Sequence, residues 1–215
     1  MGDLLTDKGS EIGEMIRIHA ILRAQAAPEY TEEQWPSSIQ VQSKHNTPIE
    51  GFWLWVRKGE GHNLRNVLEE GRDRGIFNGS DDLHVCVFNW IWPPLVQHRL
   101  DGFCEYWNHH RIRKQQNKTL PAGTSPNQLW ISPESAVATA KNCSIRVDME
   151  LVKALREELG GEEGRDEALQ FVTREFEEEA QTAYTNLQTP AVDLTNVWHI
   201  FTLLVAEIQQ LRTET

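Results

Sequence analysis

The sequence has few cysteines, no long hydrophobic run and no N-terminal signal for secretion. Its three cysteines, Cys86, Cys104 and Cys143, form no CxxC pair and cannot all be joined in disulfides. The longest apolar stretches, residues 85–96 and 197–206, are too short to cross a bilayer. The first residues lack a basic segment followed by an apolar one. We therefore expect a nuclear or cytoplasmic protein with reduced thiols, which is not secreted and has no membrane partner.

Common catalytic and metal-binding motifs are also missing. The sequence contains no Walker motif, no GxGxxG and no Ser-His-Asp arrangement, so nucleotide hydrolysis and acyl transfer have no support. His109 and His110 lie near Cys104, but they lack the CxxC or HxxxH spacing of zinc ligands. We interpret these two histidines as solvated residues at the end of a helix.

The net charge of −11 argues against a protein that coats nucleic acid by bulk attraction. The charge is uneven, because residues 151–215 hold 13 acidic and 5 basic side chains. Residues 1–150 hold 19 acidic and 16 basic side chains. Within them, residues 111–118 contain four cations and no acid, and we call this stretch the basic segment. It indicates either phosphate contacts or a solvated loop.

Hydrophobic periodicity predicts a mostly helical chain with one or two short strands. The strand candidates are residues 4–6 and 39–42. Two apolar stripes at helical spacing, in residues 169–187 and 194–211, predict two C-terminal helices.

Local signals predict where several helices start and stop. Pro93-Pro94 is expected to break or kink a long helix, and Gly59 and Gly61 are expected to end an earlier one. Residues suited to begin a helix precede four other apolar runs, namely Ser10, Thr47, Ser125 and Asp148.

Asp7 and Glu50 form the most informative pair of acidic residues. Asp7 follows the first strand candidate, and Glu50 lies in the first turn of the helix after the second. Carboxylates in such positions can hold Mg²⁺ or Mn²⁺, which prefer oxygen ligands. Alternatively, Glu50 completes a capping box with Thr47, and Asp7 is a turn residue before Gly9. Spacing alone leaves both interpretations open.

Four segments resemble the motifs of integrase core domains. They are Thr-Asp-Lys-Gly-Ser-Glu (6–11), Ser-Lys-His-Asn-Thr-Pro-Ile-Glu-Gly-Phe-Trp (43–53), Trp-Asn-His-His-Arg-Ile-Arg-Lys-Gln (107–115) and Ser-Pro-Asn-Gln-Leu-Trp (125–130). The first two look like the second and third acidic motifs of ribonuclease H-like DDE transposases and retroviral-type integrases. The third is the most specific. The resemblance is best to transposon-derived proteins of fungal and animal genomes, and it covers roughly residues 4–132.

The resemblance implies an α/β, mostly helical fold and a division of the chain. Residues 1–132 are expected to form a partial ribonuclease H-like core, residues 133–147 a linker and residues 148–215 an acidic helical extension. The implied parent activity is metal-dependent DNA strand transfer. Asp7 and Glu50 are the implied catalytic residues and ligands of Mg²⁺ or Mn²⁺. The implied nucleic-acid contacts are Lys44, Arg111, Arg113, Lys114 and Lys118.

Two departures from the family pattern affect the expected activity. The family triad is Asp, Asp, Glu, and its first Asp stands on a strand upstream of the second, whereas this chain begins six residues before Asp7. We therefore expect the metal-bridging Asp to be absent and strand transfer not to occur. Pro48 also stands where the motif has an arginine. Weak, sequence-independent DNA binding is the expected residual function.

A function of another class is the alternative. The acidic C-terminal helices can form a protein–protein interaction module that binds a protein partner or a second copy of the chain. Aromatic side chains are open to two interpretations, base stacking or core packing, and their helical spacing favours the core. They are Trp53, Trp55, Trp90, Trp92 and Trp107.

Overall fold

The computed structural model describes residues 4–7, 9, 12–41, 47–114, 121–141 and 144–214. Of Asp7, Thr47 and Pro48 it describes the backbone alone. Contacts between residues divide the chain into two compact units. Unit 1 comprises residues 1–55 and 107–168, and unit 2 comprises residues 56–106 and 169–215.

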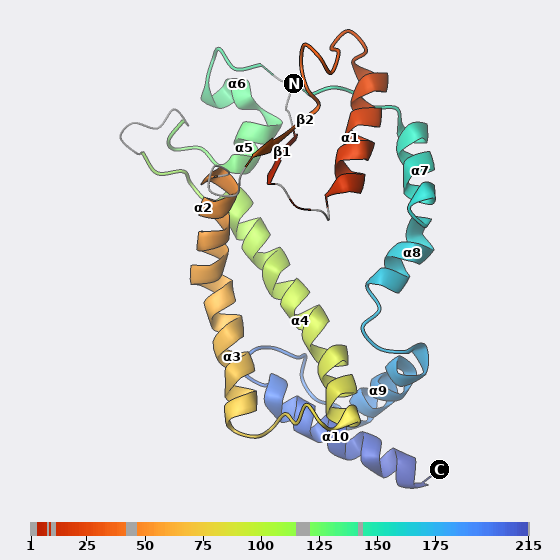
Figure 1. The fold of residues 1–215 in the computed structure, drawn as a ribbon. Coiled ribbons are helices and arrows are strands. Elements are labelled where there is room, and N and C mark those ends of the chain that lie inside the picture. Colours follow the sequence, from red (N-terminus) through yellow and green to blue (C-terminus); the bar gives the residue numbers. More distant parts are fainter. Residues whose placement is uncertain are drawn as a thin grey trace. The chain divides into compact units, whose positions relative to one another are not determined.

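A parallel pair of short strands lies in unit 1 (Figure 1). β1 (Leu4–Asp7) and β2 (Ser38–Val41) run side by side, with Asp7 opposite Val41 at their carboxyl ends. Parallel strands need a crossover connection, and α1 (Gly13–Ala26) lies in that connection. Both strand candidates of the sequence are confirmed, and so is the mostly helical composition.

A buried arginine holds the connection between α1 and β2. The Arg23 guanidinium donates a hydrogen bond to the Trp35 carbonyl and lies 3.9 Å from the Glu32 carboxylate. That carboxylate accepts a 2.8 Å hydrogen bond from the Ser37 N–H, which lowers the pKa of Glu32. The Ser37 carbonyl accepts a 3.1 Å hydrogen bond from the Leu4 N–H. This chain of contacts places the start of β2 beside the start of β1.

Polar caps begin two of the later helices of unit 1. The Ser125 side chain accepts a hydrogen bond from the Gln128 N–H at 3.2 Å, and Asp148 accepts one from the Glu150 N–H at 2.9 Å. Both predicted caps are thus confirmed, whereas Ser10 lies outside the described residues. The helices of this part of the chain are α5 (Pro126–Ile131), α6 (Pro133–Ala136), α7 (Met149–Glu158) and α8 (Gly161–Ala168).

The prediction that a glycine ends the second helix is confirmed at Gly59, whereas Gly61 keeps a helical conformation. α2 (Thr47–Val56) is followed by a π-helical segment, η2 (Arg57–Gly61), and then by α3 (His62–Asp73). Gly59 takes a non-helical conformation, with φ −91° and ψ −108°, so the chain kinks there and separates two helices. The Glu60 carboxylate accepts hydrogen bonds of 2.7–3.0 Å from the Arg99 guanidinium, which fixes the kink within unit 2.

The two adjacent prolines do not interrupt the longest helix. α4 (Asp82–His109) contains Pro93 and Pro94 in its interior and is assigned as one helix. A proline inside a helix costs about 3 kcal/mol or more through its missing N–H and its clash with the preceding turn. Val87, Ile91 and Leu95 are buried on α4, and burial of such side chains contributes about 1.5–3 kcal/mol each. Packing therefore offsets the local preference for a break.

The core of unit 2 joins α4 to two C-terminal helices. α9 (Arg174–Leu187) and α10 (Val197–Glu214) carry the two apolar stripes expected from the sequence. Much of the tail is therefore core rather than a solvated extension. The buried members of this cluster are Val87, Ile91, Trp92, Leu95, Phe176, Ala180, Ala183, Val197, Trp198, Ile200, Phe201, Leu204, Val205 and Ile208.

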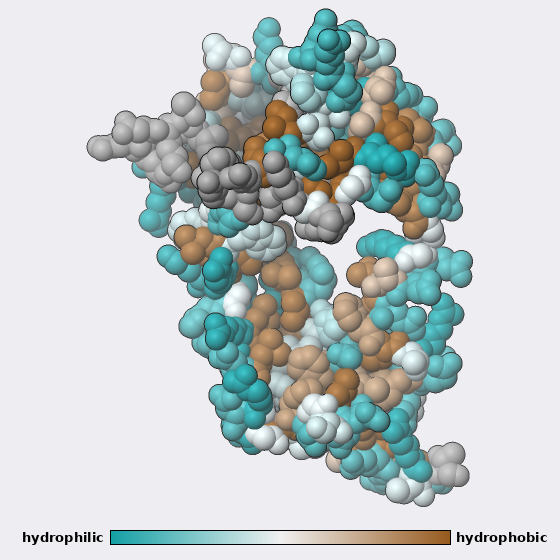
Figure 2. Space-filling view, viewed as in Figure 1, coloured by the Kyte–Doolittle hydropathy of each residue, from teal (hydrophilic) through white to brown (hydrophobic). Residues whose placement is uncertain are grey.

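Hydrophilic residues cover much of the face drawn in Figure 2, and apolar residues gather in patches between them. Some large apolar side chains are strongly exposed, including Trp130 and Ile131 of α5. None of the helices formed by the described residues combines the length and apolarity that a membrane span requires.

Trp198 of α10 packs directly on Gly71 of α3. The indole N–H of Trp198 donates a 2.6 Å hydrogen bond to the carbonyl of Val67, which precedes it by 131 residues. A Cβ at position 71 would overlap the indole ring, so only glycine fits there without movement. The rings of Trp92 and Phe201 pack around the same indole, with centroids 5.2 and 5.4 Å from it.

We predict that Gly71→Ala lowers the free energy of unfolding of unit 2 by about 1–3 kcal/mol, because overpacking forces the indole to move. Gly102→Ala is the matched control, since Gly102 also lies in a helix and nothing approaches its Cβ position. That variant is expected to be neutral or up to about 1 kcal/mol more stable. Urea unfolding followed by tryptophan fluorescence measures both, and equal effects would contradict the packing argument.

A second prediction concerns acid stability. The Glu179 carboxylate accepts two 2.7 Å hydrogen bonds from the Arg212 guanidinium, which lowers the pKa of Glu179. The pair therefore stabilises the fold above the unfolded-state pKa of Glu, and this contribution is lost as pH falls through the folded-state pKa.

Glu179→Gln is expected to cost about 0.5–1 kcal/mol at pH 7 and almost nothing at about pH 3. Thermal unfolding across this pH range provides the measurement, with the exposed neighbour Glu178→Gln as the control. A cost that is independent of pH would show that the ion pair is not its source.

Candidate functional site

Asp7 lies at the carboxyl end of β1, opposite Val41 of β2. In open sheets of parallel strands, ligands commonly bind beyond this edge. The backbone thus places Asp7 where a functional carboxylate is expected, while its side chain lies outside the described atoms. Its assignment as a catalytic residue and metal ligand stays a prediction.

Glu50 lies in the first turn of α2 and is exposed. Thr47, the first residue of α2, follows Val41 by six residues. Six residues of fully extended chain reach at most about 20 Å, so the start of α2 lies within about 20 Å of the end of β2. This limit is compatible with a shared site for Asp7 and Glu50, but it does not bring the two carboxylates together. Asp7 and Glu50 as a pair of ligands in one metal centre therefore stay a prediction.

The donor chemistry of this pair fits a hard divalent cation in part. Two carboxylates supply oxygen ligands of the kind that Mg²⁺ and Mn²⁺ prefer, and water commonly supplies others. Among the described side chains, no three His, Cys, Asp or Glu residues gather where they could hold a metal ion. The Asp7 side chain is not part of that set.

The basic segment begins just beyond α4 and enters a closed loop. The Ile112 N–H donates a 2.7 Å hydrogen bond to the Thr124 carbonyl, and the Gly123 N–H donates a 2.9 Å bond to the Ile112 carbonyl. Gly123 has φ +86°, a conformation that favours glycine. These two backbone hydrogen bonds join Ile112, within the basic segment, to Gly123 and Thr124.

Side chains of α4 and α5 add to these backbone hydrogen bonds. The His109 imidazole and the Asn127 amide are hydrogen-bonded at 3.2 Å. Thr124 donates a 2.8 Å hydrogen bond from its hydroxyl to the Gln128 amide oxygen. These contacts link the end of α4 to the start of α5. His109 thus has a structural partner that sequence reasoning missed, because the pairing joins residues 18 positions apart.

The described cations of the basic segment are available for ligands. Arg111, Arg113 and Lys114 are all exposed. None of the three forms an ion pair with an acidic residue in the part of the chain that the structure describes. Lys118 and Lys44, the other predicted nucleic-acid contacts, lie outside the described residues.

Aromatic residues of α2 lie beside the end of α4 within unit 1. The ring centroids of Phe52 and Trp55 lie 5.3 and 6.1 Å from the ring centroid of Trp107. Trp53 and Trp55 are 53% and 62% exposed, so the expectation that they belong to the core is wrong. Trp92 is buried as expected. Aromatic surface is thus available close in sequence to the basic segment, which begins four residues after Trp107.

A family model described as integrase core domain matches residues 6–144. This range is more than half of the chain, and it contains Asp7, Glu50 and the whole basic segment. The protein is of the integrase-like class, with an origin related to transposon or retroviral integrases. The chain belongs to the integrase core domain family. No curated protein and no solved structure matches it.

The metal ligands can be tested without catalysis. We predict that Glu50→Gln and Asp7→Asn each weaken Mn²⁺ binding by about tenfold or more, since each removes a charged oxygen ligand. Glu33→Gln is the control, because Glu33 is an exposed carboxylate of unit 1 outside the candidate site. Electron paramagnetic resonance of free Mn²⁺ measures the affinity. If all three variants bind Mn²⁺ with the same affinity, Asp7 and Glu50 are not metal ligands.

Proposed function

We propose that the chain is a DNA-binding protein derived from a transposon integrase of the ribonuclease H-like DDE type. The observation that carries this proposal is the closed loop of the basic segment, which lies within the family match and holds exposed cations. Arg111, Arg113 and Lys114 would contact phosphates, with Lys118 as the fourth cation of the segment. Such contacts position DNA without reading its sequence.

The carboxylates of Asp7 and Glu50 are proposed as remnants of the catalytic centre. When bound, Mg²⁺ or Mn²⁺ would supply activation of the attacking oxygen and stabilisation of the leaving oxygen in phosphodiester chemistry. Asp7 and Glu50 match the second and third acidic positions of the family pattern, and the first has no match within these 215 residues. We propose DNA binding as the function of the basic segment, in the nucleus or cytoplasm.

Salt dependence provides the quantitative test. Each phosphate contact that releases counterions changes the slope of log K against log salt by about −0.9 on duplex DNA. Replacing Arg111, Arg113 and Lys114 by Gln is therefore expected to reduce the slope by about 2.7. Fluorescence anisotropy of labelled duplex DNA at several salt concentrations measures the slope.

The control must change the net charge equally. Arg65, Arg72 and Arg74 are exposed cations of unit 2, and each pairs with an acidic neighbour. Their replacement by Gln also lowers the net charge by three, but it is expected to leave the slope nearly unchanged. If both triple variants bind DNA equally, the basic segment is not the DNA site. Deleting the acidic residues 151–215 is unsuitable as a charge control, because α9 and α10 belong to the core of unit 2.

A helical protein-interaction module is the second candidate function. A cavity in unit 2 supports it, since its aromatic and acidic lining lies outside the residues proposed to bind DNA. A protein partner or a second copy of the chain would then use the C-terminal helices.

A further inference from the structure

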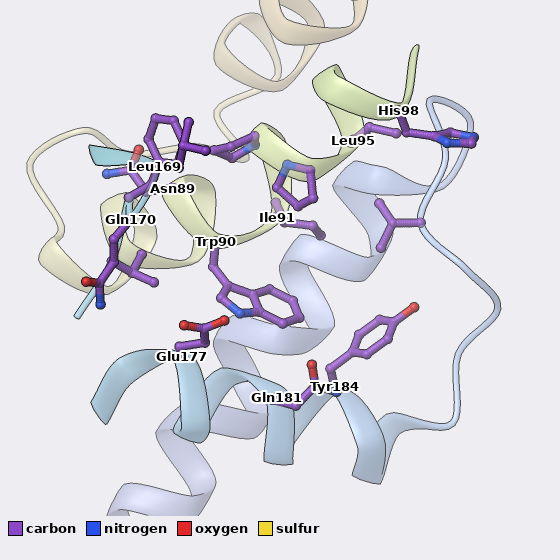
Figure 3. Close-up of a pocket in the computed structure, with 15 residues that line it drawn as sticks. Asn89, Trp90, Ile91, Leu95, His98, Leu169, Gln170, Glu177, Gln181 and Tyr184 are labelled. Atoms are coloured by element: carbon purple, nitrogen blue, oxygen red, sulfur yellow. The ribbon is translucent and has the colours of Figure 1, made fainter. Parts of the chain in front are cut away.

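A cavity of about 510 Å³ lies within unit 2, lined by α4, α9 and the segment 169–172 (Figure 3). Its volume falls in the range of pockets that hold small ligands or several side chains, about 300–1,000 Å³. Neither Asp7 nor Glu50 nor the basic segment contributes to it. Its chemistry is therefore separate from that of the proposed DNA-binding site.

One wall of the cavity is aromatic. The rings of Trp90 and Tyr184 have centroids 5.7 Å apart and planes inclined by 57°. The Tyr184 hydroxyl donates a 3.1 Å hydrogen bond to the Pro190 carbonyl, which fixes the ring. Leu169 and Phe171 also line the cavity and are 56% and 57% exposed. Apolar surface thus extends from the cavity to solvent.

The α4 side of the cavity contains the two adjacent prolines. Pro93 and Pro94 have no N–H to donate to the carbonyls of Asn89 and Trp90, four residues before them. All four residues line the cavity. The usual intrahelical donors are therefore missing at these two carbonyls.

The charge of the cavity is negative. Glu177, Gln181 and Tyr184 occupy one face of α9, and Figure 3 shows the Trp90 indole between Glu177 and Tyr184. Glu177 alone among the described lining residues carries a formal charge when His98 is neutral. Unit 2 as a whole contains 15 acidic and 8 basic side chains. Charge complementarity therefore favours a cation.

We infer that this cavity docks a segment of a partner protein that places an arginine next to an apolar side chain. A guanidinium can stack on the Trp90 indole while its N–H groups reach the Glu177 carboxylate. The adjacent apolar side chain covers Leu169 and Phe171. A free small cation would leave that rim exposed, which is why the occupant is a peptide.

The test uses the full chain and two peptides, Ac-Leu-Arg-Leu-NH₂ and the same peptide with citrulline, a neutral analogue of arginine. Peptide is added to about 5 mM, which detects millimolar affinity. The indole N–H signal of Trp90 is followed by NMR and assigned with Trp90→Phe. The arginine peptide is expected to shift this signal and to bind about fivefold more tightly than the citrulline peptide.

Two variants separate the cavity from the general acidity of α9. Glu177→Gln is expected to weaken binding of the arginine peptide about fivefold. Glu178 is an exposed neighbour outside the cavity, and Glu178→Gln is expected to leave the affinity for this peptide unchanged. Both variants lower the negative charge of the helix equally. Thermal unfolding confirms that each variant is folded.

Several outcomes would overturn the inference. They are no shift of the Trp90 signal, equal affinity for the arginine and citrulline peptides, or equal weakening by the two Glu variants. A further binding experiment uses Nα-acetyl-arginine amide, which lacks the two leucines. If it binds as tightly as the tripeptide, the cavity is a site for a small cation and not for a peptide. None of these results depends on DNA binding, so the proposed function is tested independently.

Discussion

The contact between Trp198 and Gly71 is the constraint on which unit 2 depends. It combines a close approach that only glycine permits with a 2.6 Å hydrogen bond from the indole to the Val67 carbonyl. Because α10 is thereby joined to α3, the acidic tail of the sequence is an integral part of a hydrophobic core. In the same unit, α9 and α4 line the cavity that contains Trp90 and Glu177. Charge and packing thus act on opposite faces of the same helices.

Unit 1 is held together by polar groups to a greater extent. Hydrogen bonds of Arg23, Glu32 and Ser37 hold β2 beside β1. The paired strands form the sheet edge where Asp7 lies. The loop of the basic segment is fixed by backbone hydrogen bonds of Ile112 and Gly123. The sheet edge at Asp7 and the base of the basic segment are therefore each held by short-range hydrogen bonds.

Local features of the fold could be predicted from the sequence, and long-range features could not. Ser125 and Asp148 were recognisable as caps because their partners lie two or three residues away. The continuity of α4 through Pro93 was not, because burial against α9 and α10 decides it. For the candidate site, motifs located Asp7, Glu50 and the basic segment. The exposure of Trp53 and the loop closure at Ile112 depend on contacts that no local pattern records.

The discontinuity of unit 2 has a consequence for biosynthesis. A ribosome releases α3 and α4 well before it translates Trp198, which lies 131 residues beyond Val67. At about 5–20 residues per second, this interval is on the order of 10 s. During that time the apolar face of α4 has no partner from α10, and the nascent chain is open to aggregation. Chaperone capture of incomplete chains is therefore expected to decide the yield of folded protein.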